Sequence, residues 1–423
     1  MWLLVLFIAL LFGGMRIPFA IAFSSFIALL VSNMPLILIP QRIIAGIDSF
    51  ALLAVPFFLL AGEVMKSGGL SRRLVRFANA LIGHITAGLP MVMVLSATFF
   101  AAISGSAPAT TASIGSVMIP EMEKKNYPKP FAAALAAASG PIGQMIPPSI
   151  PMVVWAVIAN VSIVRMFLGG ILPGVLMATA LMLLSRYLSK KRSYGVASAK
   201  APRSEVIDSF KDGFWALMTP VIILGGIYSG VFTPTEAAAV AVAYGLFVGF
   251  FIYGELKLSD LPEILYGSVK STAIVIFVVA AASLFGWIMA SEMVAPKIAQ
   301  SILNITTNKY LLLLMLNVML LLIGCFMDNI AAMIILAGVL TSIAGKAGVD
   351  PVHFGVIVVI NFAIGMVTPP LGYSLFVGAS ISDQTIETVS RAVWPFIMVE
   401  IVVLAILTYC PWIALSIPNL VYQ

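Results

Sequence analysis

Long stretches without a charged residue constrain this chain more than any other feature of its sequence. Three windows, Phe77–Pro120, Pro130–Val164 and Phe354–Ser382, contain no Asp, Glu, Lys or Arg. Each window is longer than the roughly 20 residues that cross the hydrocarbon layer of a bilayer. Only 9% of the 423 residues are charged, compared with about 25% in an ordinary soluble domain. The sequence therefore predicts an all-α integral membrane protein.

The charges and the reactive residues exclude several other classes of protein. The formal net charge of +6 is explained by basic loops held on the cytoplasmic side of a membrane, so no nucleic acid is expected as a partner. Two cysteines and two histidines provide almost no material for a metal cluster, a disulfide framework or a Cys/His catalytic pair. We therefore expect no enzymatic activity.

The chain contains an internal repeat. The segment IGQMIPP begins at Ile142 and IGMVTPP begins at Ile364, an offset of 222 residues. The same offset relates Pro173 to Pro395 and Ser106 to Asp328. A basic loop separates the halves, so we expect a first repeat over residues 1–211 and a second over 212–423. Since the basic excess of the first half is missing from the matching loops of the second, the repeats are predicted to be inverted in the membrane.

Each half has two apolar arms that are too short to cross a bilayer. In the first half they flank Ser104-Gly105-Ser106, and in the second they flank Met327-Asp328-Asn329. Each arm measures about 20 Å as a helix, compared with a hydrocarbon layer of about 30 Å. We therefore expect two re-entrant hairpins, an inward one over 90–120 and an outward one over 311–345, with tips facing each other near mid-membrane.

Two Pro-Pro pairs predict broken helices. Pro147-Pro148 interrupts the helix expected over 131–162, and Pro369-Pro370 interrupts the one over 354–382. A proline frees the carbonyl four residues before it, and a free carbonyl in a dry layer needs a partner. A desolvated cation fits a cluster of such oxygens. The alternative, a structural kink whose carbonyls accept bonds from Ser or Thr hydroxyls, stays open.

Asp328 is the only Asp, Glu, Lys, Arg or His between Tyr310 and Gly345. A charge in the membrane is costly and is by default a functional candidate. Together with nearby hydroxyls and freed carbonyls, it forms an oxygen donor set that suits sodium. Ser104, Ser106 and Asp328 are also candidates for substrate contact. The predicted sodium ligands are Ser104, Ser106, Gly143, Ile146, Pro148, Asp328, Asn329, Gly365, Thr368 and Pro370.

Glu400 lies in an apolar run and has several interpretations. It could carry protons, pack against a partner subunit, or extend its carboxylate toward the membrane surface. Ser104 or Ser106 could also serve as the nucleophile of an intramembrane hydrolase if His84 or His353 supplied the base, although we expect His353 in an outward loop. A passive channel is a further alternative, but paired hairpins favour alternating access.

Five segments together resemble the large membrane subunit of tripartite ATP-independent periplasmic (TRAP) transporters. They are AGEVMKSGGLSRRL, FAAISGSAPATTASIGSVMIPEM, SGPIGQMIPPSIPMVVWA, GGIYSGVFTPTEAAAVA and INFAIGMVTPPLGYSLFV. The likeness covers essentially the whole chain. It implies a sodium-driven, elevator-type symporter in the bacterial inner membrane, with sodium sites at the hairpin tips and helix breaks chosen above.

The resemblance also implies partners and a class of substrate. The partners are a small four-helix membrane subunit, expected here as a separate chain, and a soluble periplasmic substrate-binding protein. Family substrates are mostly organic acids, including sialic acids and C4-dicarboxylates. The chain looks most like sialic-acid members, and a C4-dicarboxylate or another carboxylate is the alternative.

Overall fold

A computed structural model describes residues 2–195, 201–294, 297–298, 300–301, 306 and 308–422 of the chain, and this part is helical without a β-strand. The helices of the first half are α1 (Trp2–Phe12), α2 (Ile17–Val31), α3 (Leu38–Ile47), α4 (Ala54–Ser67), α5 (Leu70–Ile82), α6 (Gly88–Ser104), α7 (Ala107–Lys124), α8 (Lys129–Ser139), α9 (Ile142–Met145), α10 (Ile150–Ile158) and α11 (Ile163–Lys191). The all-α prediction is confirmed.

The second half continues with further helices. They are α12 (Arg203–Tyr228), α13 (Pro234–Phe247), α14 (Leu261–Ser291), α16 (Lys309–Gly324), α17 (Asn329–Lys346), α18 (Pro351–Gly365), α19 (Tyr373–Ser382), α20 (Ile386–Tyr409) and α21 (Pro411–Val421). Among the described residues, seven helices are long and apolar enough to cross a membrane, and a bent helix pair raises the number to eight.

Both expected hairpins form pairs of helices. The first consists of α6 and α7, joined at Gly105, whose φ of +61° suits glycine. The second consists of α16 and α17, joined by residues 325–328. Ser106 and Asp328 occupy the same position, the N-cap of the second arm. The repeat offset is therefore visible in the local structure, while the opposite insertion and re-entrant course of the hairpins stay predictions.

Both helix breaks lie where the proline pairs predict them. The first separates α9 from α10, and the axis bends by 44° there. The second separates α18 from α19. The peptide bond within each proline pair is cis. The first broken helix has an additional interruption at Gly140-Pro141 that we did not predict.

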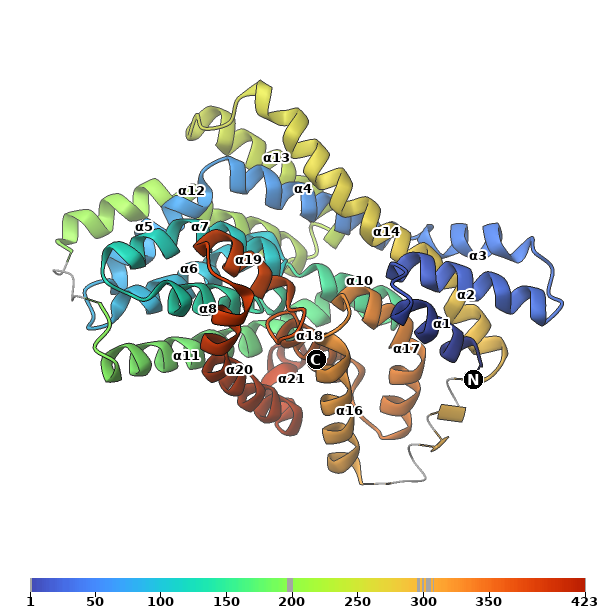
Figure 1. Cartoon of the computed structure of the whole chain (residues 1–423). Coiled ribbons are helices and arrows are strands. Elements are labelled where there is room, and N and C mark those ends of the chain that lie inside the picture. Colours follow the sequence, from blue (N-terminus) through green and yellow to red (C-terminus); the bar gives the residue numbers. More distant parts are fainter. Residues whose placement is uncertain are drawn as a thin grey trace.

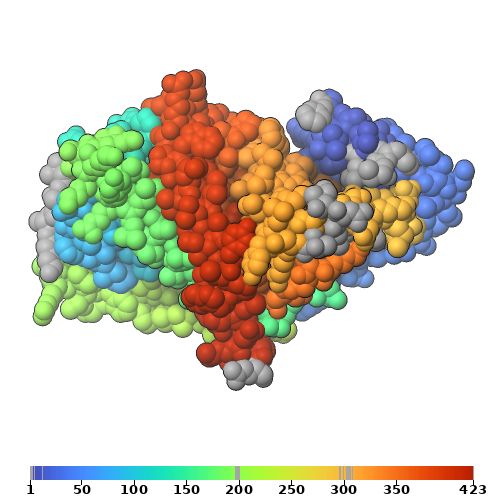
Figure 2. Space-filling view, turned by 90° about the horizontal axis from the view of Figure 1, so that it is seen from below, coloured from blue at the N-terminus to red at the C-terminus, as the bar shows by residue number. Residues whose placement is uncertain are grey.

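Helices from the two halves interlock. α12, α13, α4 and α14 run along one edge of the molecule, and α2 and α3 pack beside α14 (Figure 1). Inside this edge, α19 and α20 of the second half pack against α8 of the first, and α21 packs against α11. The C-terminal segment, in red, crosses the middle of the face in Figure 2. The halves 1–211 and 212–423 therefore share one core.

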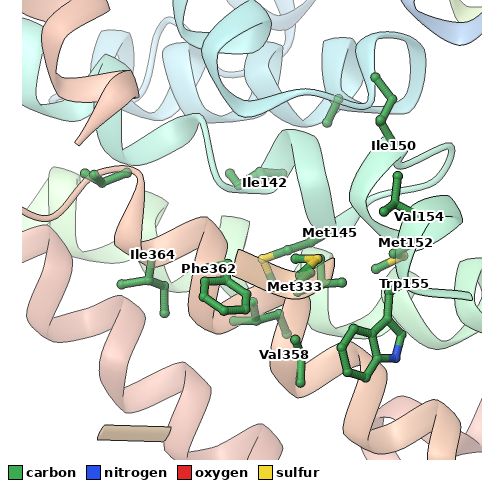
Figure 3. Packing of buried hydrophobic residues seen from close by; sticks show 14 of the residues in the cluster. Ile142, Met145, Ile150, Met152, Val154, Trp155, Met333, Val358, Phe362 and Ile364 are labelled. Atoms are coloured by element: carbon green, nitrogen blue, oxygen red, sulfur yellow. The ribbon is translucent and has the colours of Figure 1, made fainter. Parts of the chain in front are cut away.

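Apolar side chains beside the first break pack in that core against α17 and the start of α18. Met145 and Met152, on either side of the first break, lie near Met333 of α17 (Figure 3). Trp155 of α10 packs edge-on against Phe354 of α18, with ring centroids 6.2 Å apart. All five side chains are buried, so the first break lies inside protein rather than against lipid, the condition under which a membrane helix tolerates a break.

The basic stretch between Glu63 and Arg76 spans the end of α4 and the start of α5. Arg73 of α5 forms ion pairs with Asp212 of α12 (3.1 Å) and with Glu255 (2.6 Å), and its guanidinium stacks on the Tyr253 ring. Part of the corresponding stretch in the second half, between residues 291 and 309, lies outside the described residues.

Candidate functional site

The first hairpin tip packs directly on the first helix break. The backbone N–H of Ile150 donates to Gly105 O at 3.2 Å, and a Cβ added to Gly105 would lie 2.6 Å from Pro148 O. A Cβ on Gly143 would lie 2.8 Å from Ser106 O and would overlap the Thr110 hydroxyl. Glycine at both positions thus permits close backbone approach.

Four of the five residues predicted for the first site are therefore brought together. They are Ser104, Ser106, Gly143 and Pro148. Ile146, the fifth, directs its side chain toward Gly174 of α11, so it can contribute to the site only through its backbone.

Hydroxyl groups fill the first site, and two of them escaped the sequence analysis. The Ser104 and Thr110 hydroxyls form a buried hydrogen bond of 2.8 Å. The Thr111 hydroxyl, which faces Gly140, is buried and has no hydrogen-bond partner among the described residues. Both threonines lie in the uncharged segment FAAISGSAPATT, and a buried hydroxyl in such a segment was the signal that could have found them.

The first break partly follows the structural alternative. Pro148 leaves Gln144 O without its helical donor, and the Ser149 hydroxyl donates to this oxygen at 2.5 Å. Gly143 O likewise lacks a helical donor, because Pro147 has no backbone N–H. Because a carbonyl oxygen has two lone pairs, Gln144 O keeps one for a further partner.

The second tip is organised by its acidic residue. Asp328 Oδ1 accepts hydrogen bonds from the backbone N–H groups of Ile330 (3.0 Å) and Ala331 (3.2 Å). The carboxylate therefore caps α17, a structural role that the sequence analysis did not assign to it. Asn329, the next residue, is 3% exposed and reaches into the interior.

Backbone groups close the second break. Gly365 O accepts from Thr368 N at 3.1 Å, and Met366 O accepts from Ser374 N at 2.9 Å. The Thr368 hydroxyl donates to Ile364 O at 2.8 Å. A Cβ on Gly365 would lie 2.6 Å from the carbonyl carbon of Gly324, so the hairpin arm and the broken helix touch through their backbones. Pro370, also predicted for this site, is exposed.

The donor set of the two breaks consists mainly of oxygen atoms. Within the described ranges, no group of three or more His, Cys, Asp or Glu residues could hold a metal ion. The oxygens offered by the breaks and tips are carbonyls, hydroxyls and one carboxylate, which suits a hard cation better than a transition metal. This chemistry fits the predicted sodium ligands, whose roles stay a prediction.

Three further residues bear on the location expected for His353 and on the alternatives left open by the sequence. His353 lies buried in the first turn of α18, rather than in an outward loop, and its Nε2 is 2.9 Å from Leu407 O. The Ser104 hydroxyl pairs with Thr110 and not with a histidine. Glu400 is fully buried within this chain, so its side chain packs inside this protein and not against a partner subunit.

The family model described as tripartite ATP-independent periplasmic transporter, DctM component, matches residues 4–413. The chain belongs to this family. A DctM chain is a transporter permease and a multi-pass protein of the bacterial inner membrane.

Known relatives of this DctM chain carry several substrate names. The sialic acid TRAP transporter large permease SiaM of Vibrio cholerae is 41% identical over 98% of the chain and 97% of its own length. The isethionate TRAP transporter permease DctMQ of Oleidesulfovibrio alaskensis is 46% identical over 90% of the chain, which spans 60% of that relative. The C4-dicarboxylate permease DctM of Pseudomonas aeruginosa is 41% identical over 88% of the chain and 87% of its own length.

A solved structure shares the fold of this DctM chain at low sequence identity. The YdaH transporter of Alcanivorax borkumensis superposes with a TM-score of 0.64 at 17% identity, over 89% of the chain and 87% of that protein. The likeness concerns the fold alone.

Proposed function

We propose that this DctM chain is the permease of a sodium-driven symporter that takes up an organic acid anion, with sialic acid as the first candidate. The proposal includes a small four-helix membrane subunit and a periplasmic protein that delivers the substrate. The names of the relatives support an acid but differ in which one. C4-dicarboxylate uptake by the same mechanism is therefore the second candidate.

The observation that carries the proposal is that each hairpin packs against a helix break. The Ile150 N–H donates to Gly105 O at the first, and Gly324 and Gly365 touch through their backbones at the second. Broken helices whose ends face a buried site are a recurrent way for transporters to present backbone oxygens to a coupling ion. Here the first site offers Gly143 O and Gln144 O, and the second offers Gly365 O and the Asp328 carboxylate. These oxygens are proposed to bind sodium.

Order at the tips would link sodium to the substrate. Ser106 and Asp328 are the N-caps of the second hairpin arms, and Ser104 is held by Thr110. Filled oxygen sites would fix both tips and neutralise Asp328, so an anion could dock between them. Because each ligand organises the site of the other, their affinities are coupled in both directions. The tips and broken helices would then move together as one block, the elevator step.

The test is uptake by proteoliposomes that contain the co-purified membrane complex. A panel of sialic acid, C4-dicarboxylates and isethionate is offered with and without an inward sodium gradient and a candidate binding protein. We expect saturable uptake that requires the gradient and is greatest for sialic acid. Uptake that does not change when the gradient is collapsed would contradict sodium coupling, and non-saturable flux would favour a channel.

A further inference from the structure

One side chain joins the two helix breaks. Gln144, next to the first proline pair, accepts a hydrogen bond from Asn329 Nδ2 at its Oε1 (2.9 Å) and directs its Nε2 toward Met366 Sδ (3.1 Å). Gln144, Asn329 and Met366 are 2%, 3% and 4% exposed, so water does not compete for these bonds. The amide thus reaches from the first break to both the tip and the break of the second half.

The position of this bridge follows from the repeat. Residues 144 and 366 differ by 222, the repeat offset, so Gln144 and Met366 are each other's counterparts. Contact between equivalent residues is what a two-fold arrangement produces at its axis. The two breaks therefore lie next to each other across this axis, and a side chain at the axis can contact both of them.

The bridge cannot be duplicated by the other half. The counterpart of Asn329 is Ala107, which has no polar side chain, and the counterpart of Gln144 is Met366, whose sulfur is only a weak acceptor. A single amide therefore carries the polar connection described here between the two breaks.

Gln144 takes part in both sites through different atoms. Its backbone oxygen lies at the first break, where the Ser149 hydroxyl holds it, and its side chain holds Asn329 at the second tip. A buried amide that loses its partner is strongly disfavoured, so a shift of the first break must either carry Asn329 with it or break this bond. Ordering of one site thereby favours order in the other.

We propose that Gln144 is the positioning residue that couples the two cation sites, so that occupancy of one raises the affinity of the other. This inference rests on the proposed sodium function and adds to it the residue that makes the sites cooperative. Coupling between two binding sites is typically about 5- to 150-fold in affinity. In wild-type protein the sodium isotherm should therefore be steeper than that of independent sites.

The test is the sodium binding isotherm of the purified protein, followed by the rise in thermal midpoint with sodium concentration. Gln144→Met has a side chain of similar length and flexibility, but its sulfur is only a weak acceptor in place of the amide oxygen that binds Asn329 Nδ2. We expect it to bind sodium with a Hill coefficient that falls to about one. Gln144→Glu, which keeps an acceptor for Asn329 Nδ2, should retain most of the wild-type steepness.

A matched control is a buried amide that lies outside the bridge. Asn317 of α16 accepts from Asn361 Nδ2 at 2.9 Å and donates to the Thr408 hydroxyl at 2.8 Å. Asn317→Leu should lower the thermal midpoint and leave the steepness of the sodium isotherm as in wild type. A loss of steepness in this variant would show that any buried amide has the effect and would overturn the assignment to Gln144.

The outcomes separate the coupling from the proposed function. If wild-type protein shows no sodium response, the proposed function fails. If wild type responds cooperatively and Gln144→Met is equally steep, only the coupling fails. Where Gln144→Met cannot be purified as folded protein, Gln144→Leu removes the same bond without changing a predicted sodium ligand, and the same criterion applies to it.

Discussion

The two helix breaks have the same sequence register but are completed by different groups. At the first break, the Ser149 hydroxyl pairs with the freed carbonyl of Gln144. At the second, backbone N–H groups of Thr368 and Ser374 pair with the freed carbonyls of Gly365 and Met366. The first tip holds paired hydroxyls, whereas the second holds a carboxylate that caps a helix.

The difference shows that one backbone design can be supported in two ways. Side chains complete the first site, so single substitutions there should remove specific hydrogen bonds. Backbone contacts complete the second site, so it should tolerate loss of a hydroxyl but should not tolerate added volume. Its one indispensable side chain should be Asp328, because no other described group at that tip is charged.

The largest expected effect comes from volume added at the second break. A Cβ in Gly365→Ala would lie 2.6 Å from the Gly324 carbonyl carbon, and backbone cannot move aside as a side chain can. We expect a cost of about 3 kcal/mol or more and little folded protein after purification. In Gly143→Ala the overlap is partly with the Thr110 side chain, so Thr110→Ala should partly restore the melting temperature. Equal damage from both glycine substitutions, without rescue, would contradict the contrast.

The next effect concerns the carboxylate of the second tip. Asp328→Asn removes the charge but keeps a good N-cap, so the sodium concentration for half-maximal uptake should rise about tenfold or more, a change of about 1.4 kcal/mol. The melting temperature should change little. Asp328→Ala should also lower stability by about 1 kcal/mol, because the cap is lost. Unchanged sodium dependence in Asp328→Asn would show that the carboxylate caps α17 and does not bind sodium.

A smaller effect is expected for the hydroxyl that completes the first break. Ser149→Ala leaves Gln144 O without its donor and should reduce stability by about 1–3 kcal/mol. The matched variant is Leu371→Ala at the equivalent position of the second half. There the side chain is 44% exposed and donates no hydrogen bond to a carbonyl. Thermal unfolding should show a loss below about 1 kcal/mol there. Similar losses in both variants would remove the distinction between the breaks.

The smallest expected effect is the difference in stability between removing the Thr368 hydroxyl and removing the Thr110 hydroxyl. In Thr368→Val, Ile364 O still accepts from Val367 N at 3.0 Å, so the change in stability should stay within about 0.5 kcal/mol. Thr110→Val leaves the buried Ser104 hydroxyl without this partner and should cost about 1 kcal/mol. Thermal unfolding measured side by side checks the order, and a larger loss in Thr368→Val would reverse it.

The sequence predicted the architecture better than the contacts. The Pro-Pro pairs placed both breaks because proline removes a donor wherever it stands, and Ser104-Gly105-Ser106 placed a tip because glycine and serine end a helix. The sequence could not show that Ser149 would pair with Gln144 O, since this depends on the local course of the chain. The bridge from Gln144 to Asn329 joins residues 185 positions apart, and only the packing of the two halves brings them together.

The sodium sites themselves can be counted directly. Equilibrium binding of radioactive sodium to the purified protein in lipid nanodiscs, with wild type and Asp328→Asn in parallel, measures the number of saturable sites in each. We predict two sites in wild type, one from each break, and a single remaining site at the same sodium concentrations in Asp328→Asn. Absence of saturable binding in wild type, or the same count in both proteins, would contradict this prediction.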